Sequence, residues 1–322
     1  MKKVAILVPE MAVAQAIADP QYCLSAVNQL LEQSGQPLRF DIQLVGKAAN
    51  ISVFPGNFEV KPDVLLSDSL IYDLVIIPAM FGPPAEAIAR NQAYVPWIIG
   101  QFRKGAEIAS LCLGAFLFAE TGLLNGKKCS THWGFADEFK RRYPEVELMD
   151  GQIVTEVDGL YSSGGANSYW NLLLHLVEKY SDRVMAIHVA KYFAIDISRN
   201  SQSAFSIFQG QKNHPDELIK QVQNLIESKL DGKITVDELA ETVALGRRSL
   251  ERRFKQATNN SILEYIQRVK MEAAKRSFEN SRKNIFEVMD GLGYSDPKAF
   301  RTTFKKITGV TPTAYRNRYQ KA

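Results

Sequence analysis

The C-terminal third of the chain contains one pattern twice, and this repeat restricts the possible fold more than any other feature of the 322 residues. The segment Thr235 to Ala240 is matched 49 residues later by Asn284 to Met289, and after one inserted residue the offset becomes 50. The first residue of each copy and a glutamate three residues later, Glu238 or Glu287, form a capping box that begins a short helix. A turn and a second helix follow in each copy. The repeat therefore predicts two successive helix-turn-helix units.

The second helix of each copy has an apolar face and a charged face. Its apolar side chains recur at i, i+4 and i+7, a spacing that predicts a buried face. They are Leu250, Phe254 and Ala257 in the first copy and Phe300, Phe304 and Ile307 in the second. Long cationic side chains on an open helix face are typical of a helix that enters the major groove of DNA. The residues that we predict to face DNA are Arg248, Glu251, Arg252, Lys255, Lys298, Arg301, Thr302, Lys305 and Lys306.

A longer helix is predicted between the two copies, from about Ile262 to Glu279, with Ser261 and Glu264 as its capping box. Its 18 residues span about 27 Å at 1.5 Å each. That length is comparable to the ~34 Å of one DNA turn. One protomer can therefore place both second helices in successive major grooves.

This half of the chain closely resembles the AraC family of regulators, from about residue 216 to 320. The segment GLGYSDPKAFRTTFKKITGVTPTAYR (291–316) carries the resemblance most specifically, and residues 244–275 also follow the family pattern. The resemblance implies that the partner is double-stranded operator DNA. It also implies that Arg248, Glu251, Arg252, Lys298, Arg301 and Thr302 are the DNA-facing positions.

Charge divides the chain into two parts. Residues 1–205 carry a net charge of −4, whereas residues 206–322 carry +8. Such asymmetry favours one nucleic-acid-binding domain, although charge alone is equally compatible with a solvated, lysine-rich surface. The polar segment 198–210, which has no carboxylate, separates the two parts. We therefore predict an α/β sensor domain over 1–197, a linker over 198–213 and a DNA-binding domain over 214–322.

Short aliphatic strands alternate with helical stretches in the first part. The predicted strands are Val4–Val8, Ile42–Val45, Leu74–Ile77 and Glu107–Leu111, and the predicted helices are Val13–Gln33, Ala85–Arg103, Ala115–Thr121, Trp133–Arg142 and Ala166–Tyr180. This alternation predicts βαβ units in a mostly parallel sheet with helices on both faces. The expected fold class is α/β, a flavodoxin/Rossmann-like sandwich, followed by an all-α domain with two helix-turn-helix motifs. Ligands of such sheets bind beyond the carboxyl ends of the strands.

Two loops at strand ends have features of binding sites. Cys112 lies where a strand meets a helix, and Gly114 allows that helix to pack close to the sheet, as in a nucleophile elbow. The helix dipole can lower the pKa of a thiol there, but a free cysteine also packs as a small hydrophobe. Gly164 and Gly165 begin a second loop, which either presents N–H groups to an anion or is simply a turn.

The first part resembles the PfpI-type intracellular protease/amidase superfamily, which has the class I glutamine-amidotransferase-like fold. Residues 110–127, CSTHW (129–133) and residues 158–179 carry the resemblance. Catalytic members pair the elbow cysteine with a carboxylate and often with a histidine directly after it. This chain has Ala16 and Leu113 at those positions, and Pro78 to Gly82 where enzymes have a glycine pair.

These departures predict a sensor pocket rather than an active site, because a cysteine without a base has little activation. His132 is expected to cap a helix or to pack. The candidate pocket residues are Cys112, Leu113, Gly82, His132, Gly164 and Gly165. The alternative function is a cysteine-dependent amidase or protease with Cys112 as nucleophile, and a less specific one is an architectural DNA-binding protein.

Composition supports a folded protein without cofactor or metal. Three cysteines in no metal-type spacing favour neither a disulfide framework nor a zinc site. The longest apolar run, Ile108 to Ala119, is too short for the ~17–25 residues of a membrane span, and the N-terminus does not resemble a signal peptide. We expect a cytoplasmic regulator that binds an unidentified small effector, and the family resemblance implies a homodimer.

Overall fold

The computed structural model describes residues 1–54, 56–212, 214–232 and 234–320. The chain divides into two compact units, Met1–Gln202 and Ser203–Ala322. The division falls inside the segment predicted as a linker, whose last residue, Asn213, lies outside the described residues. No helix among the described residues is long and apolar enough to cross a membrane.

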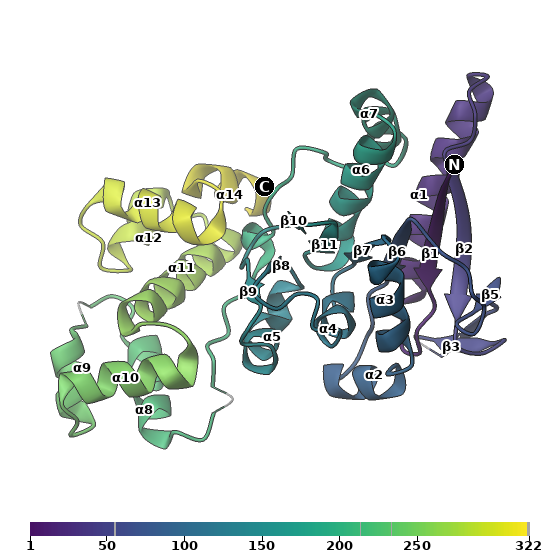
Figure 1. Cartoon of the computed structure of the whole chain (residues 1–322). Coiled ribbons are helices and arrows are strands. Elements are labelled where there is room, and N and C mark those ends of the chain that lie inside the picture. The colour runs from purple at the N-terminus through teal and green to yellow at the C-terminus, as the bar shows by residue number, and fades with distance from the viewer. Residues whose placement is uncertain (55, 213, 233, 321–322) are drawn as a thin grey trace. The chain divides into compact units, whose positions relative to one another are not determined.

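The N-terminal unit is built on a seven-stranded sheet with the order β10-β11-β7-β6-β1-β2-β5 (Figure 1). Its strands are β1 (Lys2–Leu7), β2 (Phe40–Gly46), β5 (Val64–Leu65), β6 (Leu74–Ile77), β7 (Glu107–Ser110), β10 (Val154–Val157) and β11 (Leu160–Ser163). All neighbours are parallel except the edge pair β10 and β11. The central strands β1 and β6 are almost wholly buried, as expected for a parallel sheet covered on both faces. The predicted mostly parallel α/β sheet is confirmed.

Helices cover both faces of this sheet. On one face α1, α6 and α7 pack against one another, and α2, α3 and α4 lie on the other (Figure 1). The helices are α1 (Ala14–Gln33), α2 (Pro84–Arg90), α3 (Tyr94–Arg103), α4 (Gly114–Ala119), α5 (Ala136–Arg142), α6 (Tyr169–Tyr180) and α7 (Arg183–Tyr192). Two small sheets lie outside the main one: β3 (Ile51–Val53) with β4 (Phe58–Val60), and β8 (Lys128–Cys129) with β9 (Glu147–Leu148).

The helix predicted over Ala85–Arg103 is wrong as one element, because the chain turns between α2 and α3. Asn91 lies at this break and is fully buried. Its side-chain amide accepts a hydrogen bond from the N–H of Glu10 and donates to the carbonyls of Glu10 and Ala87, all at 2.8–2.9 Å. A buried amide that satisfies this many backbone groups ends the helix locally.

Two further predicted helices begin as short 3-10 turns, η1 (Trp133–Phe135) before α5 and η2 (Ala166–Ser168) before α6. The sequence pattern did not indicate α7, the edge strands β5 and β10, or the two small sheets. Short strands and a helix of ten residues carry too little periodicity to be separated from loops.

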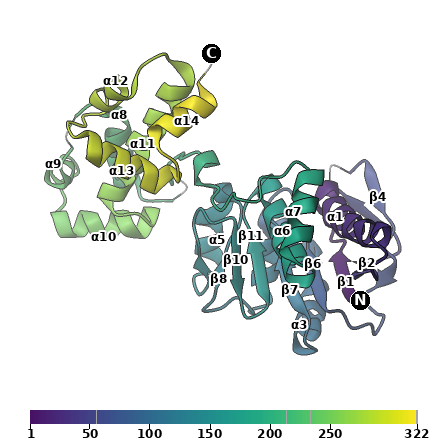
Figure 2. The ribbon, with the colours of Figure 1, turned by 90° about the horizontal axis from the view of Figure 1, so that it is seen from above.

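The C-terminal unit is entirely helical in its described part (Figure 2). A 3-10 turn, η3 (Ser203–Phe205), precedes seven helices: α8 (Glu217–Ser228), α9 (Val236–Thr242), α10 (Arg247–Thr258), α11 (Ile262–Asn280), α12 (Ile285–Asp290), α13 (Pro297–Thr308) and α14 (Pro312–Tyr319). The capping boxes predicted at the starts of α9, α11 and α12 are all present. Two helix-turn-helix motifs, α9–α10 and α12–α13, therefore flank the long helix α11.

Each motif has its own hydrophobic core, and both cores include α11. The predicted buried faces of α10 and α13 need one correction, because Ala257 and Ile307 are only half-buried. The third buried position is instead Thr258 in α10 and Thr308 in α13. Each threonine hydroxyl donates to a carbonyl one turn earlier, at 2.8 Å, so its burial leaves no unpaired donor.

Lys270 fixes the two motifs to each other. It is buried in α11, and its ammonium donates to the carbonyl of Gly232 before α9 and to that of Leu292 after α12, at 3.0 and 2.8 Å. A Cβ on Gly293 would lie 2.5 Å from the Asp231 carbonyl oxygen, so glycine is required where the two loops meet. These contacts set the separation of the two second helices.

Candidate functional site

Cys112 occupies a sharp turn between β7 and α4. Its φ of 54° lies in the left-handed region, which is costly for a residue with a side chain. A Cβ on Gly114 would lie 2.6 Å from the carbonyl oxygens of Ile77 and Pro78, so glycine is needed where α4 approaches β6. The predicted elbow geometry is therefore present.

The thiol of Cys112 is buried, and burial raises its pKa to about 11. The N–H groups of Ala166 and Leu113 point at the sulfur and act in the opposite direction, but they do not outweigh desolvation. Burial therefore outweighs any decrease in the pKa of Cys112 that the helix dipole causes. Cys112 is a thiol at neutral pH and packs as a small hydrophobic residue.

The structure brings one carboxylate near the elbow that sequence comparison overlooked. Ala16 is fully buried, but Asp19, one turn later on α1, accepts hydrogen bonds from Tyr169 and Trp170 at 2.6 and 2.9 Å. Burial raises the pKa of the Tyr169 phenol, and the nearby Asp19 and Cys112 raise it further. Tyr169 therefore lies close to both Asp19 and Cys112. Asp19 is therefore engaged with two aromatic donors and does not contact the thiol directly.

His132 caps η1, as predicted. Its Nδ1 accepts the N–H of Gly134 at 3.0 Å, and its ring packs against Trp133 and Phe135. A Cβ on Gly165 would lie 2.2 Å from this ring. Glycine at 165 is thus explained by space, since the loop passes directly over the imidazole.

Burial lowers the pKa of His132 below 6.5, which predicts a pH dependence of stability. As the pH falls through 6.5, the unfolded chain binds a proton that the folded chain does not, so the free energy of unfolding decreases. His132→Asn keeps an acceptor for Gly134 and cannot titrate. We expect the loss of stability between about pH 7.5 and 5.5 to be smaller in this variant, as measured by urea unfolding. The matched control is His188→Asn at an exposed position, and equal losses in all three proteins would contradict the expectation.

The elbow lacks the groups that would activate a nucleophile. No carboxylate or imidazole among the described residues hydrogen-bonds to Cys112, and a pKa of about 11 leaves the thiol almost wholly un-ionised at pH 7. We therefore expect no turnover of peptide or amide substrates beyond that of Cys112→Ser. Steady hydrolysis that this substitution abolishes would contradict the expectation and favour the amidase alternative.

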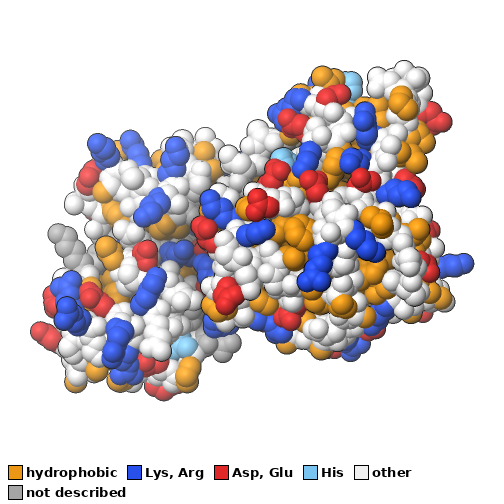
Figure 3. All heavy atoms as spheres, in the orientation of Figure 1, with side chains coloured by type: hydrophobic (Ala, Val, Ile, Leu, Met, Phe, Trp, Pro, Cys, Tyr) orange, Lys and Arg blue, Asp and Glu red, His pale blue; other side chains and the backbone are white. Residues whose placement is uncertain are grey.

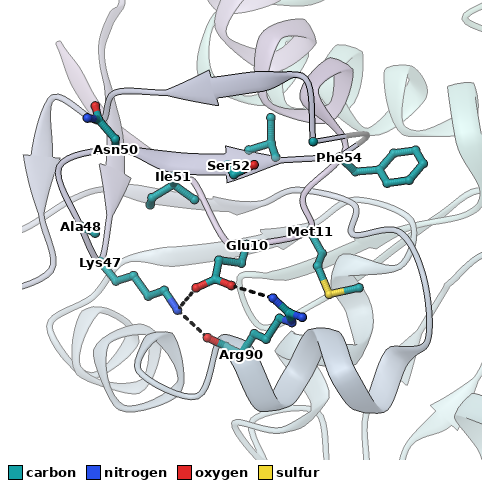
Figure 4. A pocket seen from close by; sticks show the side chains of 11 residues that line it. Glu10, Met11, Lys47, Ala48, Asn50, Ile51, Ser52, Phe54 and Arg90 are labelled. Atoms are coloured by element: carbon teal, nitrogen blue, oxygen red, sulfur yellow. Dashed lines mark hydrogen bonds and ion pairs between the residues drawn. The ribbon is translucent and has the colours of Figure 1, made fainter.

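A separate cavity of about 470 Å³ lies at the carboxyl ends of β1 and β2. Lys47, Glu10 and Arg90 point toward one another at one end of it (Figure 4), with Lys47 Nζ 2.6 Å and Arg90 Nη1 3.4 Å from the Glu10 carboxylate. The hydrogen bond from Lys47 lowers the pKa of Glu10, and Arg90 adds a smaller effect. Apolar side chains such as Met11 and Ile51, together with the polar Asn50 and Ser52, form the remaining wall.

Five of the six predicted pocket residues gather at the elbow: Cys112, Leu113, His132, Gly164 and Gly165. Gly82, the sixth, has no described contact with these five residues. Its neighbour is Met11, which lines the separate cavity. Sequence reasoning missed that cavity, although Glu10 and Lys47 each closely follow a strand. No group of three metal-binding side chains occurs in the described part of the chain.

All nine residues predicted to face DNA are exposed on α10 and α13 or their last turns. Lysine and arginine side chains gather over the regions of both helices on the face that Figure 3 displays. Arg252 and Arg301 make no hydrogen bond or ion pair to a described residue. Glu251 is paired with Arg247 at 3.2 Å, and Lys255 donates to the carbonyl of Asn259 at the end of α10.

The two second helices end alike. Asn259 after α10 and Gly309 after α13 both adopt the left-handed conformation, and both N–H groups return to the carbonyl four residues earlier. Each helix has 12 residues. The internal repeat thus produces two helices of equal length with equivalent buried and exposed faces.

Two protein-family models match different parts of the chain. The model of the DJ-1/PfpI family matches residues 3–179, and a helix-turn-helix domain model matches residues 239–318. Among curated relatives, the HTH-type transcriptional regulator ArgR of Pseudomonas aeruginosa is 28% identical over 67% of this chain and 65% of its own length. The HTH-type transcriptional regulator GlxA of Rhizobium meliloti is 24% identical, over 67% of each chain. The match to these relatives spans about two thirds of their length.

Solved structures show the fold of the N-terminal unit. An AraC family transcriptional regulator from Pseudomonas putida is 17% identical, with a TM-score of 0.52 over 60% of this chain and 100% of that one. A THiJ/PfpI family protein from Pseudomonas syringae is 15% identical, with a TM-score of 0.51 over 76% of this chain and 90% of that one. The chain belongs to the DJ-1/PfpI family and carries an AraC-type helix-turn-helix region after the α/β unit of that family.

Proposed function

We propose that this chain is a sequence-specific DNA-binding transcription regulator whose α/β unit binds a small effector. The observation that carries the proposal is that α10 and α13 each have an exposed cationic face. Lys270 of α11 connects the two motifs that contain these helices. The curated relatives are transcriptional regulators, which supports a regulator rather than an enzyme. We further propose a homodimer that acts in the cytoplasm.

The effector is proposed to bind beyond the carboxyl ends of the strands, as in other doubly wound sheets. Two places there are supported by the structure: the elbow around Cys112 and the cavity beside Glu10, Lys47 and Arg90. The elbow combines inward-facing N–H groups with a neutral thiol. The cavity combines paired charges with a wall of apolar and small polar side chains.

The function is tested by selecting duplexes from a random pool with the purified chain and then titrating the enriched sequence. We expect a specific complex whose affinity falls steeply with salt. A chain that enriches no sequence would contradict the proposal. Effector binding is tested by repeating the titration with fractionated small molecules from cells, where a change in affinity for the selected duplex is expected.

Lys305 and Lys306, exposed in the last turn of α13, are expected to contact phosphates. Replacing either by alanine should weaken binding to selected and unrelated duplexes alike, and should lower the slope of log affinity against log salt by about 1. Fluorescence titrations over a series of KCl concentrations measure both effects. Lys104→Ala, at an exposed position of the α/β unit, is the control. A loss confined to the selected duplex would contradict the phosphate assignment.

A further inference from the structure

Gln202 is the last residue of the α/β unit, and its side chain hydrogen-bonds to three other segments of that unit. Its Nε2 donates to the carbonyls of Thr131 at 2.8 Å and Gln152 at 3.3 Å, and its Oε1 accepts the N–H of Gly165 at 2.8 Å. The residue is 2% exposed. A Cβ on Gly164 would lie 2.8 Å from the same amide, so glycine at 164 makes room for Gln202.

The loops that contain Thr131 and Gly165 also contact Cys112. The hydroxyl of Thr131 donates to the carbonyl of Cys112 at 3.0 Å, and the N–H of Ala166, next to Gly165, points at the sulfur. One residue, Thr131, separates Gln202 from Cys112 on one side, and two residues, Gly165 and Ala166, separate them on the other. A molecule that enters the elbow cannot displace either loop without disturbing the hydrogen bonds of Gln202.

A few residues later, the same stretch of chain is held by the DNA-binding unit. The Lys275 ammonium donates to the carbonyl of Ser206, and the N–H of Phe208 donates to the Glu272 carboxylate at 3.1 Å. Lys275 and Glu272 form an ion pair of 2.7 Å on α11, with side chains only 6% and 10% exposed. The turn η3, which lies between Gln202 and Ser206, packs against α13.

We propose that residues 202–208 form a coupling segment that transmits changes at the Cys112 elbow to the DNA-binding unit, with Gln202 as its positioning residue. Three residues separate the anchors at Gln202 and Ser206, and each can span at most about 3.6 Å, so the segment has little slack. Release of the Gln202 side chain leaves only backbone contacts, such as the N–H of Gln202 to the Gly151 carbonyl at 2.8 Å, to hold this end of the stretch that continues through η3, beside α13, to α11. The proposal rests on the proposed function.

The test uses the full chain and the duplex selected by it. Two elbow substitutions, Cys112→Leu and Thr131→Val, change the side chain or the carbonyl contact of Cys112 and leave the sequence of the C-terminal unit unchanged. At least one folded variant should change duplex affinity by about 2- to 30-fold. In a Gln202→Ala background the same substitution should change affinity less than about twofold. Gln209→Ala, an exposed glutamine beyond both anchors, is the matched control and should preserve the full effect.

A second variant does not depend on Gln202→Ala folding. A flexible Gly-Ser-Gly-Ser insertion between Gln202 and Ser203 keeps both anchors but adds slack, and it should also abolish the effect of the elbow substitutions. An effect that survives the insertion or Gln202→Ala, or elbow variants that never change affinity, would overturn the coupling. A wild-type chain that selects no duplex would instead contradict the proposed function, and the coupling with it.

Discussion

Replacing Arg252 and Arg301 together by alanine is expected to weaken binding to the selected duplex by about 30- to 2 × 10⁴-fold. An arginine that reads a base edge is worth about 1–3 kcal/mol, and contributions from residues on separate helices add. Both guanidinium groups are exposed, one on α10 and one on α13. Neither is paired with a described residue, so neither must break an ion pair to reach DNA. Titration of a labelled duplex measures the loss.

The matched control keeps the positive charge at both positions but removes the planar guanidinium group. In Arg252→Lys with Arg301→Lys, each side chain still attracts phosphate but can no longer form two parallel hydrogen bonds to guanine. We expect unrelated duplexes to bind this variant with nearly wild-type affinity, while preference for the selected sequence falls. If selected and unrelated duplexes lose affinity equally in the alanine variant, both residues contact phosphate and not bases.

Local signals explain why the DNA-binding unit could be predicted from sequence. Capping boxes, proline at the start of α13 and the i, i+4 spacing of Leu250 and Phe254 all act within one or two helical turns. The repeat presents each signal twice. The third buried position was misassigned because threonine is polar in sequence. Its hydroxyl becomes compatible with burial only through a hydrogen bond to the backbone of its own helix.

In the α/β unit, the parts of the candidate site that are close together in sequence could be predicted, and the parts that are distant in sequence could not. The elbow could be predicted because the strand end, the cysteine and the glycine lie within five residues, Ser110 to Gly114. The partners that decide its chemistry could not, because they are distant in sequence: Tyr169 lies 150 residues from Asp19, and Gln202 lies 71 residues from Thr131. Sequence spacing also cannot state how deeply a thiol is buried. Burial, which raises the pKa of Cys112, is therefore the property that separates a sensor-like elbow from a reactive one.

The buried ion pair of Lys275 and Glu272 gives the second large expected effect. Lys275→Met fills a similar volume but leaves the Glu272 carboxylate buried with the Phe208 N–H and Arg276, whose Nε is 3.9 Å away. Removing one partner of a buried pair costs about 3–5 kcal/mol. We expect a loss of this size in the helical unit alone, because both residues lie in α11. The double variant Glu272→Gln with Lys275→Met, which leaves no buried charge, should recover most of it.

The two units can be followed separately in the full chain. All three tryptophans, Trp97, Trp133 and Trp170, lie in the α/β unit, so their fluorescence reports the unfolding of that unit. Far-UV circular dichroism reports the helices of both units. In urea, Lys275→Met should produce an early loss of helical signal while the tryptophan transition keeps its midpoint. Coincident transitions at the wild-type urea concentration would contradict the expectation, and they would also mean that the anchor of Ser206 contributes little to holding the coupling segment.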